Sequence, residues 1–217
     1  MNKFRMHDVV VEEEPSSSVA LHDQMEKEYL EEMLEDADVQ IPFCVFLSDI
    51  TEEKMEDFVY ELHVYKESCK ALKQHNEEEV LMPLQILISS YGGALYPTLA
   101  AFDSIKTLQK HVEVETIGSG MVMSAAVLLL AAGSPGHRKI GENCRVMIHS
   151  LSTIANGVVD LETENKEMKE LEKLYIRLLS ENSRLSEKDI KKMLKKKENC
   201  YFSAHEAVAM GIADEII

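Results

Sequence analysis

The fold is decided by residues 84–93, which read LQILISSYGG and place paired glycines directly after a short apolar run. A run of this length, ended by turn residues, predicts a buried strand. Residues 95–108 follow with Leu99, Phe102 and Ile105 at helical spacing, which predicts a helix after the turn. The order of strand, turn and helix is typical of an α/β fold.

The same alternation continues outward from this stretch. We expect further strands at residues 43–47, 112–117 and 145–148, and helices at about 51–72, 123–132 and 160–182, with short helices starting at Ser186 and Ser203. The sequence Gly118-Ser119-Gly120 is expected to break the strand at 112–117. Strands that alternate with helices predict βαβ crossovers and a mostly parallel sheet covered by helices.

The composition excludes several classes of protein. The 217 residues are 45% hydrophobic and 29% charged, which excludes collagen-like, disulfide-dense and wholly disordered chains. The net charge of −16 makes a general nucleic-acid binder a poor fit, and no apolar run reaches the roughly 18 residues of a membrane span. The four cysteines lack C-x-x-C spacing, so we expect ordinary reduced thiols, no metal site and no cofactor.

The acidity is concentrated in residues 1–40, which hold twelve acidic and three basic residues for a net charge of −9. Residues 12–18 read EEEPSSS and are expected to be disordered, and an amphipathic helix is expected after them. We therefore divide the chain into an acidic segment, 1–40, and a domain, 41–217. The first residues lack an apolar secretory core, so we expect a soluble, cytoplasmic protein.

Three predicted strands end in residues that are suited to chemistry. The turn at Gly92-Gly93 is either a plain turn or a cradle of bare N–H groups that binds an oxyanion. Ser124 follows the glycines at 118–120 and precedes an apolar helix, so it is either an N-cap or a nucleophile whose next amide, that of Ala125, stabilises negative charge. His149 ends the strand at 145–148 and is either structural or a general base. Together they have the groups that acyl transfer requires.

At this point the chain resembles a known family, ClpP, the proteolytic subunit of Clp proteases. The similarity covers about residues 41–217 and lies in the segments 116–126 (TIGSGMVMSAA), 143–149 (NCRVMIH), 90–93 (SYGG), 202–207 (FSAHEA) and 211–214 (GIAD). The resemblance implies the ClpP/crotonase-like α/β fold of repeated ββα and βαβ units. It also implies a protruding handle region at about 150–182.

The resemblance also implies roles for individual residues. Ser124 becomes the nucleophile, His149 the base, and the amides of Gly93 and Ala125 the oxyanion donors. The third triad position, which is an aspartate in the family, falls on Asn199, and Glu198 is the nearest carboxylate. A neutral amide still orients the imidazole but stabilises its cation less than a carboxylate does.

By the same resemblance the protein is expected to be a serine endopeptidase that degrades unfolded polypeptides. Family members form seven-membered rings stacked in pairs, and an AAA+ unfoldase feeds the enclosed chamber. Two alternatives stay open: a catalytically weak or inactive structural subunit, for which Asn199 is the main support, and a crotonase-like acyl-CoA enzyme. The second is disfavoured because it gives no reason for the spacing between Ser124 and His149.

Overall fold

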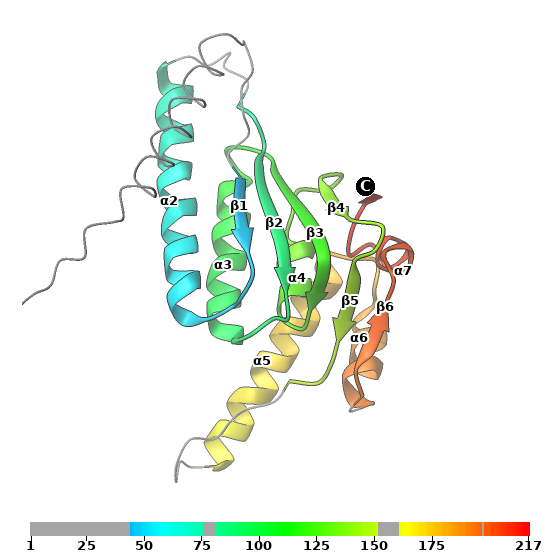
Figure 1. Ribbon diagram of the computed structural model, residues 1–217. Coiled ribbons are helices and arrows are strands. Elements are labelled where there is room, and N and C mark those ends of the chain that lie inside the picture. The colour runs from blue at the N-terminus through cyan, green and yellow to red at the C-terminus, as the bar shows by residue number, and fades with distance from the viewer. Residues whose placement is uncertain (1–43, 76–80, 152–160, 197) are drawn as a thin grey trace, which may run out of the picture. The chain divides into compact units, whose positions relative to one another are not determined.

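The computed structural model describes residues 44–75, 81–151, 161–196 and 198–217 (Figure 1). All of them lie in Pro42–Ile217, the larger of the two units into which the chain divides. The expected acidic segment and the residues directly before the handle helix lie outside the described residues.

Strands and helices alternate along the chain. The elements are β1 (Cys44–Leu47), α2 (Glu52–His75), β2 (Leu84–Ser90), α3 (Leu95–Leu108), β3 (Val114–Met123), α4 (Ala126–Ala131), β4 (Arg138–Ile140), β5 (Arg145–Ile148), α5 (Leu161–Glu181), α6 (Glu187–Lys195), β6 (Cys200–Phe202), α7 (Ala204–Ala209) and β7 (Glu215–Ile216). The sheet runs in the order β1-β2-β3-β4-β7, and β5 joins the second half of β3. These pairs are all parallel, and β6 pairs with β5 in the antiparallel sense, so the expected α/β class with a mostly parallel sheet is confirmed.

The prediction that residues 118–120 break a strand is wrong. Strand β3 runs through them, because Gly118 keeps its place in the ladder opposite Ile88 and Ile140. The register shifts after Gly118, because four residues of β3 span the distance that two residues of β2, from Ile88 to Ser90, cover. These extra residues of β3 form a bulge, in which Gly120 takes a φ of 66°. A bulge bends a strand without ending it. The apolar helix therefore starts at Ala126 rather than near Met123.

The first half of β3 pairs with β4 and its second half pairs with β5. This division brings the end of β5 beside the end of β3. The three short strands β4, β6 and β7 were not predicted, since two or three residues are too few to show a period.

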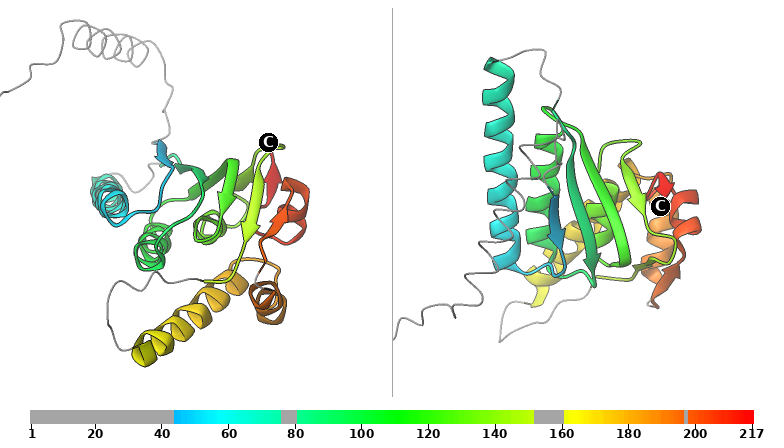
Figure 2. Two further views of the ribbon diagram at one scale, coloured as in Figure 1. Left: turned by 60° about the horizontal axis from the view of Figure 1, so that its bottom comes forward. Right: turned by 45° about the horizontal axis from the view of Figure 1, so that its top comes forward.

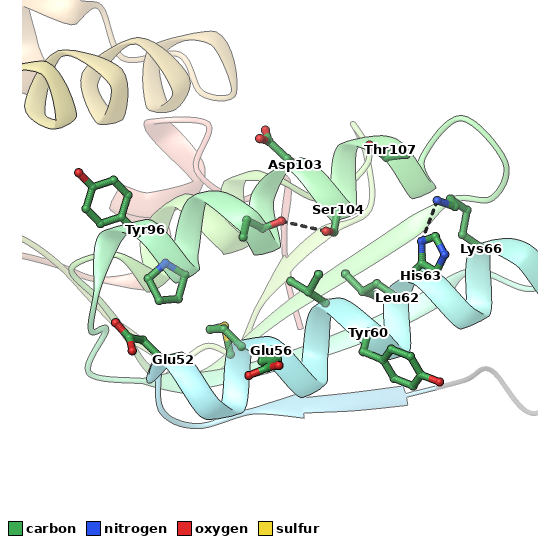
Figure 3. Close-up of a pocket in the computed structure, with 14 residues that line it drawn as sticks. Glu52, Glu56, Tyr60, Leu62, His63, Lys66, Tyr96, Asp103, Ser104 and Thr107 are labelled. Atoms are coloured by element: carbon green, nitrogen blue, oxygen red, sulfur yellow. Dashed lines mark hydrogen bonds between the residues drawn. The ribbon is translucent and has the colours of Figure 1, made fainter.

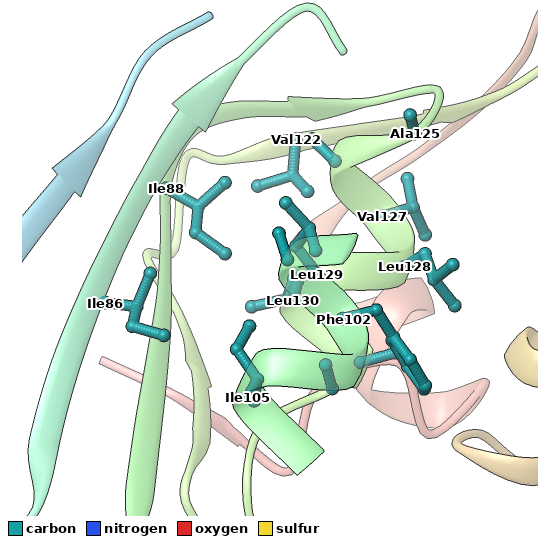
Figure 4. Packing of buried hydrophobic residues seen from close by; sticks show 14 of the residues in the cluster. Ile86, Ile88, Phe102, Ile105, Val122, Ala125, Val127, Leu128, Leu129 and Leu130 are labelled. Carbon is teal, nitrogen blue, oxygen red and sulfur yellow. The ribbon is translucent and has the colours of Figure 1, made fainter. Parts of the chain in front are cut away.

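The core lies between the sheet and the helices that cover it. Helices α2 and α3 lie side by side on one face of the sheet (Figure 2). Side chains of Ile86 and Ile88 from β2 meet those of Ile105 from α3 and Leu130 from α4, and all four are fully buried (Figure 4). Burying a side chain of this size contributes roughly 1.5–3 kcal/mol, so this contact fixes α4 against the sheet.

The C-terminal helices begin as the sequence predicts. Ser186 and Asp189 form a capping box at the start of α6, and Ser203 and Glu206 form one at the start of α7. The first turns of α5 extend away from the sheet, which confirms the protruding handle helix (Figure 1). Within the described residues, no helix has the length and apolar character needed to cross a bilayer.

Candidate active site

The carboxyl ends of β2, β3 and β5 meet at one edge of the sheet. Met123 and Met147 are partners in the ladder between β3 and β5. The amide of Ser124, the residue after Met123, donates to the carbonyl oxygen of Met147 at 2.8 Å. This hydrogen bond continues the strand pairing by one residue and brings the serine beside the segment that carries His149.

Ser124 has a backbone conformation that is uncommon for a residue with a side chain. Its φ is 55°, and it is the one non-glycine residue of the described chain with a positive φ. The N-cap of α4 is Ala125, and no side chain caps the helix there. Of the two interpretations of Ser124 in the sequence, the N-cap is therefore not the one that the structure shows. The strain is typical of a residue that the fold holds in place for function.

The hydroxyl of Ser124 faces His149 instead. Its Oγ lies 2.8 Å from Nε2 of the imidazole, and both side chains are partly buried. A hydroxyl at this distance from a ring nitrogen is within direct proton-transfer reach. The sequence separates these residues by 25 positions, and the pairing of β3 with β5 brings them together.

The glycine turn packs directly on this serine. Gly92 has a φ of 95°, and a Cβ added to it would lie 2.6 Å from the carbonyl oxygen of Met123 and 2.7 Å from Cβ of Ser124. A Cβ on Gly93 would lie 2.0 Å from the carbonyl oxygen of Ile50. Both positions therefore exclude every residue except glycine. The buried hydroxyl of Ser90 fixes the turn by accepting from the amide of Gly92 at 3.0 Å.

Two backbone amides at this place remain available to a ligand. Within the described residues, the N–H groups of Gly93 and Ala125 donate no hydrogen bond, whereas those of Gly92, Ala94 and Ser124 do. The amide nitrogen of Ala125 lies 3.1 Å from the position that a Cβ on Gly92 would take, so the turn and this amide are in close contact. The pair can serve as hydrogen-bond donors to an anionic oxygen.

His149 and Asn199 flank the end of the antiparallel pairing between β5 and β6. The last pair is Ile148 with Cys200, so His149 directly follows one of these residues and Asn199 directly precedes the other. Asn199 does not bond to the imidazole. The Asn199 amide nitrogen instead donates to the Tyr201 hydroxyl at 3.3 Å. In the part of the chain that the structure describes, neither Asn199 nor Glu198 makes a hydrogen bond or ion pair to the imidazole.

One contact of the serine has no signal in the sequence. Tyr175 lies in α5 and fits the helical apolar pattern there. Its hydroxyl donates to the carbonyl oxygen of Ser124 at 3.4 Å, and its side chain is buried. The residues are 51 positions apart, and no local pattern connects them.

Two cavities lie near these elements. A groove of about 700 Å³ runs between α2 and α3, with Met55, Val59, Tyr96 and Pro97 along it, and it includes neither Ser124 nor His149 (Figure 3). A smaller cavity of about 420 Å³ lies between α6 and β6 and is lined in part by Glu198 and Asn199. Within the described residues, no cluster of three or more His, Cys, Asp or Glu side chains has the geometry to hold a metal ion.

Comparison with known proteins identifies the family. A family model described as Clp protease matches residues 48–217. The chain is 35% identical over 135 residues to the ATP-dependent Clp protease proteolytic subunit 2 of Frankia casuarinae, over 62% of this chain and 60% of that protein. It is 34% identical over 146 residues to the ATP-dependent Clp protease proteolytic subunit of Deinococcus radiodurans, over 66% of this chain and 67% of that protein.

A third relative, the ATP-dependent Clp protease proteolytic subunit 3 of Synechococcus sp., is 32% identical over 145 residues, over 65% of this chain and 70% of that protein. The matched region spans 60% of the Frankia subunit, less than two thirds of its length. The family match, in contrast, extends over most of the chain and contains the serine, the histidine and the glycine turn described above. The chain belongs to the Clp protease family.

Proposed function

We propose that this chain is a serine endopeptidase in which Ser124 is the nucleophile and His149 the general base. The observation that carries the proposal is the 2.8 Å contact between Oγ of Ser124 and Nε2 of His149. Membership of the Clp protease family supports a peptidase in general. The strained φ of Ser124 and the free amides of Gly93 and Ala125 support the serine-type mechanism in particular.

The mechanism follows from this arrangement. The Ser124 oxygen attacks the carbonyl carbon of the scissile peptide bond while its proton passes to Nε2 of His149. The carbonyl oxygen becomes an oxyanion and accepts from the amides of Gly93 and Ala125. The imidazolium then gives its proton to the leaving nitrogen, the C–N bond breaks, and an acyl-enzyme remains. Water then attacks the acyl carbon while the same imidazole takes its proton. The bond to Oγ breaks, the acid leaves, and the imidazolium returns the proton to Oγ.

Asn199 is the proposed third member of the triad. We propose that a rotation of its side chain away from Tyr201 lets the amide oxygen accept from Nδ1–H of His149, since the two residues flank the last pair of β5 and β6, Ile148 with Cys200. Such a bond selects the tautomer that leaves Nε2 free to accept the serine proton. It stabilises the imidazolium less than a carboxylate would, so we expect a slower enzyme than one with aspartate at this position.

The proposal includes the assembly and the substrate. We propose homo-oligomeric rings, heptameric and stacked in pairs, that receive unfolded polypeptides from an AAA+ unfoldase. Family membership supports an oligomer that works with Clp ATPases in general, and the names of the relatives describe those proteins as ATP-dependent.

A second candidate function is a catalytically weak subunit whose main role is structural. The observation that favours it is the side-chain bond of Asn199 to Tyr201 rather than to His149, with no described carboxylate in contact with the imidazole. The two candidates share the fold and differ in the reactivity of Ser124.

Labelling with a fluorophosphonate probe separates these candidates. The wild-type protein should react at Ser124, and Ser124→Ala should not react. Ser119→Ala is the matched control, since Ser119 is an exposed serine of the same strand and should leave labelling unchanged. Wild-type protein that assembles but takes no label would favour the structural subunit.

A further inference from the structure

The hydroxyl of Tyr175 calls for an explanation that packing does not give. Tyr175 lies in α5 with a side chain that is 4% exposed, beside the core residues Ile176 and Leu179. A phenylalanine would fill the same space and bury no polar atom. A buried hydroxyl is costly unless it is hydrogen-bonded, and within the described residues its one partner is the carbonyl oxygen of Ser124.

The bonded carbonyl belongs to the peptide group that matters most to the proposed chemistry. The C=O of Ser124 and the N–H of Ala125 are parts of one planar trans peptide unit, so they point in opposite directions. Whatever fixes the carbonyl therefore fixes the direction of the amide. The amide in question is one of the two donors proposed for the oxyanion.

Few other contacts fix this peptide plane. The same carbonyl accepts from the amide of Val127 at 3.2 Å, in the first turn of the short helix α4. The residue that carries it has a strained φ of 55°, so relaxation of Ser124 would rotate the plane. A second donor on the carbonyl opposes that rotation. A hydrogen bond to a carbonyl also polarises its peptide group and makes the N–H a better donor.

We infer that Tyr175 is a positioning residue, whose hydroxyl holds the Ser124–Ala125 peptide so that the Ala125 amide faces the developing oxyanion. Burial raises the pKa of Tyr175, so the hydroxyl stays a neutral donor at every working pH. The handle helix α5 thereby contributes a contact to the site as well as an extension from the sheet. This inference rests on the proposed serine peptidase function.

Tyr175→Phe tests it, with Tyr65→Phe as the matched control. The hydroxyl of Tyr65 also donates to a backbone carbonyl at 3.4 Å, that of Met82, before the opposite end of β2. The measurements are kcat and KM for a fluorogenic peptide, per site titrated with a fluorophosphonate, the inhibition constant of a peptide boronate, and the melting temperature. A boronate forms a tetrahedral adduct on the serine and places an oxygen against the two amides.

We expect Tyr175→Phe to lower kcat about tenfold, less than the 10²–10³ lost with a direct oxyanion donor, because the amide remains present but is held less firmly. Boronate binding should weaken by the same factor, while KM stays within about twofold because the ground state does not use the oxyanion contact. Tyr65→Phe should leave all three constants unchanged.

Three results would overturn the assignment. One is a variant with unchanged kcat and boronate binding, whatever its melting temperature. Another is a higher KM at unchanged kcat, which would assign the hydroxyl to ground-state binding of the substrate. The third is a variant that no longer folds, which would assign the hydroxyl to the stability of the fold. If the wild-type protein takes no fluorophosphonate, the proposed function fails and this inference falls with it. If the wild type is labelled at Ser124 and Tyr175→Phe matches it, this inference alone fails.

Discussion

Ser124 is held at three groups, whereas Asn199 makes one side-chain contact in the part of the chain that the structure describes. The amide of Ser124 bonds to Met147, its carbonyl to Val127 and Tyr175, and its hydroxyl contacts His149. Asn199 is exposed and donates to Tyr201 at 3.3 Å. The proposed nucleophile is thus held in place by several contacts, whereas the residue proposed to orient the base is not. The difference indicates that rate, rather than fold, depends on the third position.

The largest effect should come from removal of the proposed nucleophile. Ser124→Ala should reduce kcat for a small fluorogenic peptide by a factor on the order of 10⁴ or more, because the hydroxyl and the imidazole act as a unit. Hydrolysis by purified, assembled variant is the measurement. Activity close to that of the wild type would contradict the assignment of Ser124 as the nucleophile.

Gly92→Ala should displace the turn that packs on Ser124 without changing a reactive group. The new methyl would lie 2.6 Å from the Met123 carbonyl at a φ of 95°, so the turn must move away from Ser124. We expect kcat/KM to fall by a factor on the order of 10², as for a misplaced catalytic geometry.

Gly136→Ala is the matched control for this substitution. Gly136 also has a positive φ, 85°, but nothing lies within 4 Å of the added Cβ. It should cost about 1 kcal/mol of stability from backbone strain and leave kcat/KM unchanged. Equal activity losses in the two variants would mean that strain, and not contact with the serine, limits the rate.

Asn199→Asp should improve the proposed third position of the triad. A carboxylate beside His149 favours the imidazolium, which we expect to speed acylation about tenfold. Peptide hydrolysis and the rate of fluorophosphonate labelling measure it. Glu198→Gln is the companion variant, and a loss of activity there would assign the role of third member to Glu198.

The smallest effect should come from Tyr201→Phe. It removes the one described partner of the Asn199 amide, which is an exposed bond at 3.3 Å and worth about 1 kcal/mol or less. We expect kcat to change by no more than about twofold. A larger loss of kcat, measured with the same peptide, would show that the bond to Tyr201 fixes Asn199 more firmly than its length and exposure indicate.

The sequence predicted those parts of the molecule that have a local cause. Helix α3 and strand β5 have the predicted bounds, because α3 follows a glycine turn and has apolar residues at helical spacing, and β5 is a short apolar run. The glycines in β3 misled the prediction, since a bulge and a strand end have the same local composition. Whether such glycines form a bulge or end a strand depends on the pairing with the neighbouring strand, which the local sequence does not show.

The site shows the same division. Ser124, His149 and the glycine turn stand out as candidates in the sequence because each follows a strand that the apolar pattern predicts. The contact from Tyr175 was not found, because the helix pattern explains a buried ring and is silent about its hydroxyl. The side-chain direction of Asn199 depends on Tyr201 and on the pairing of β6, a strand too short to predict.

The hydrogen bond from Ser124 to Met147 has a consequence for the order in which the chain gains activity. The serine is synthesised before the strand that anchors its amide and before the histidine that follows this strand. A chain that has emerged only as far as α4 therefore has the hydroxyl without its base or its backbone anchor. On the proposed function, such a chain therefore cannot hydrolyse peptides until β5 has been synthesised and has paired with β3.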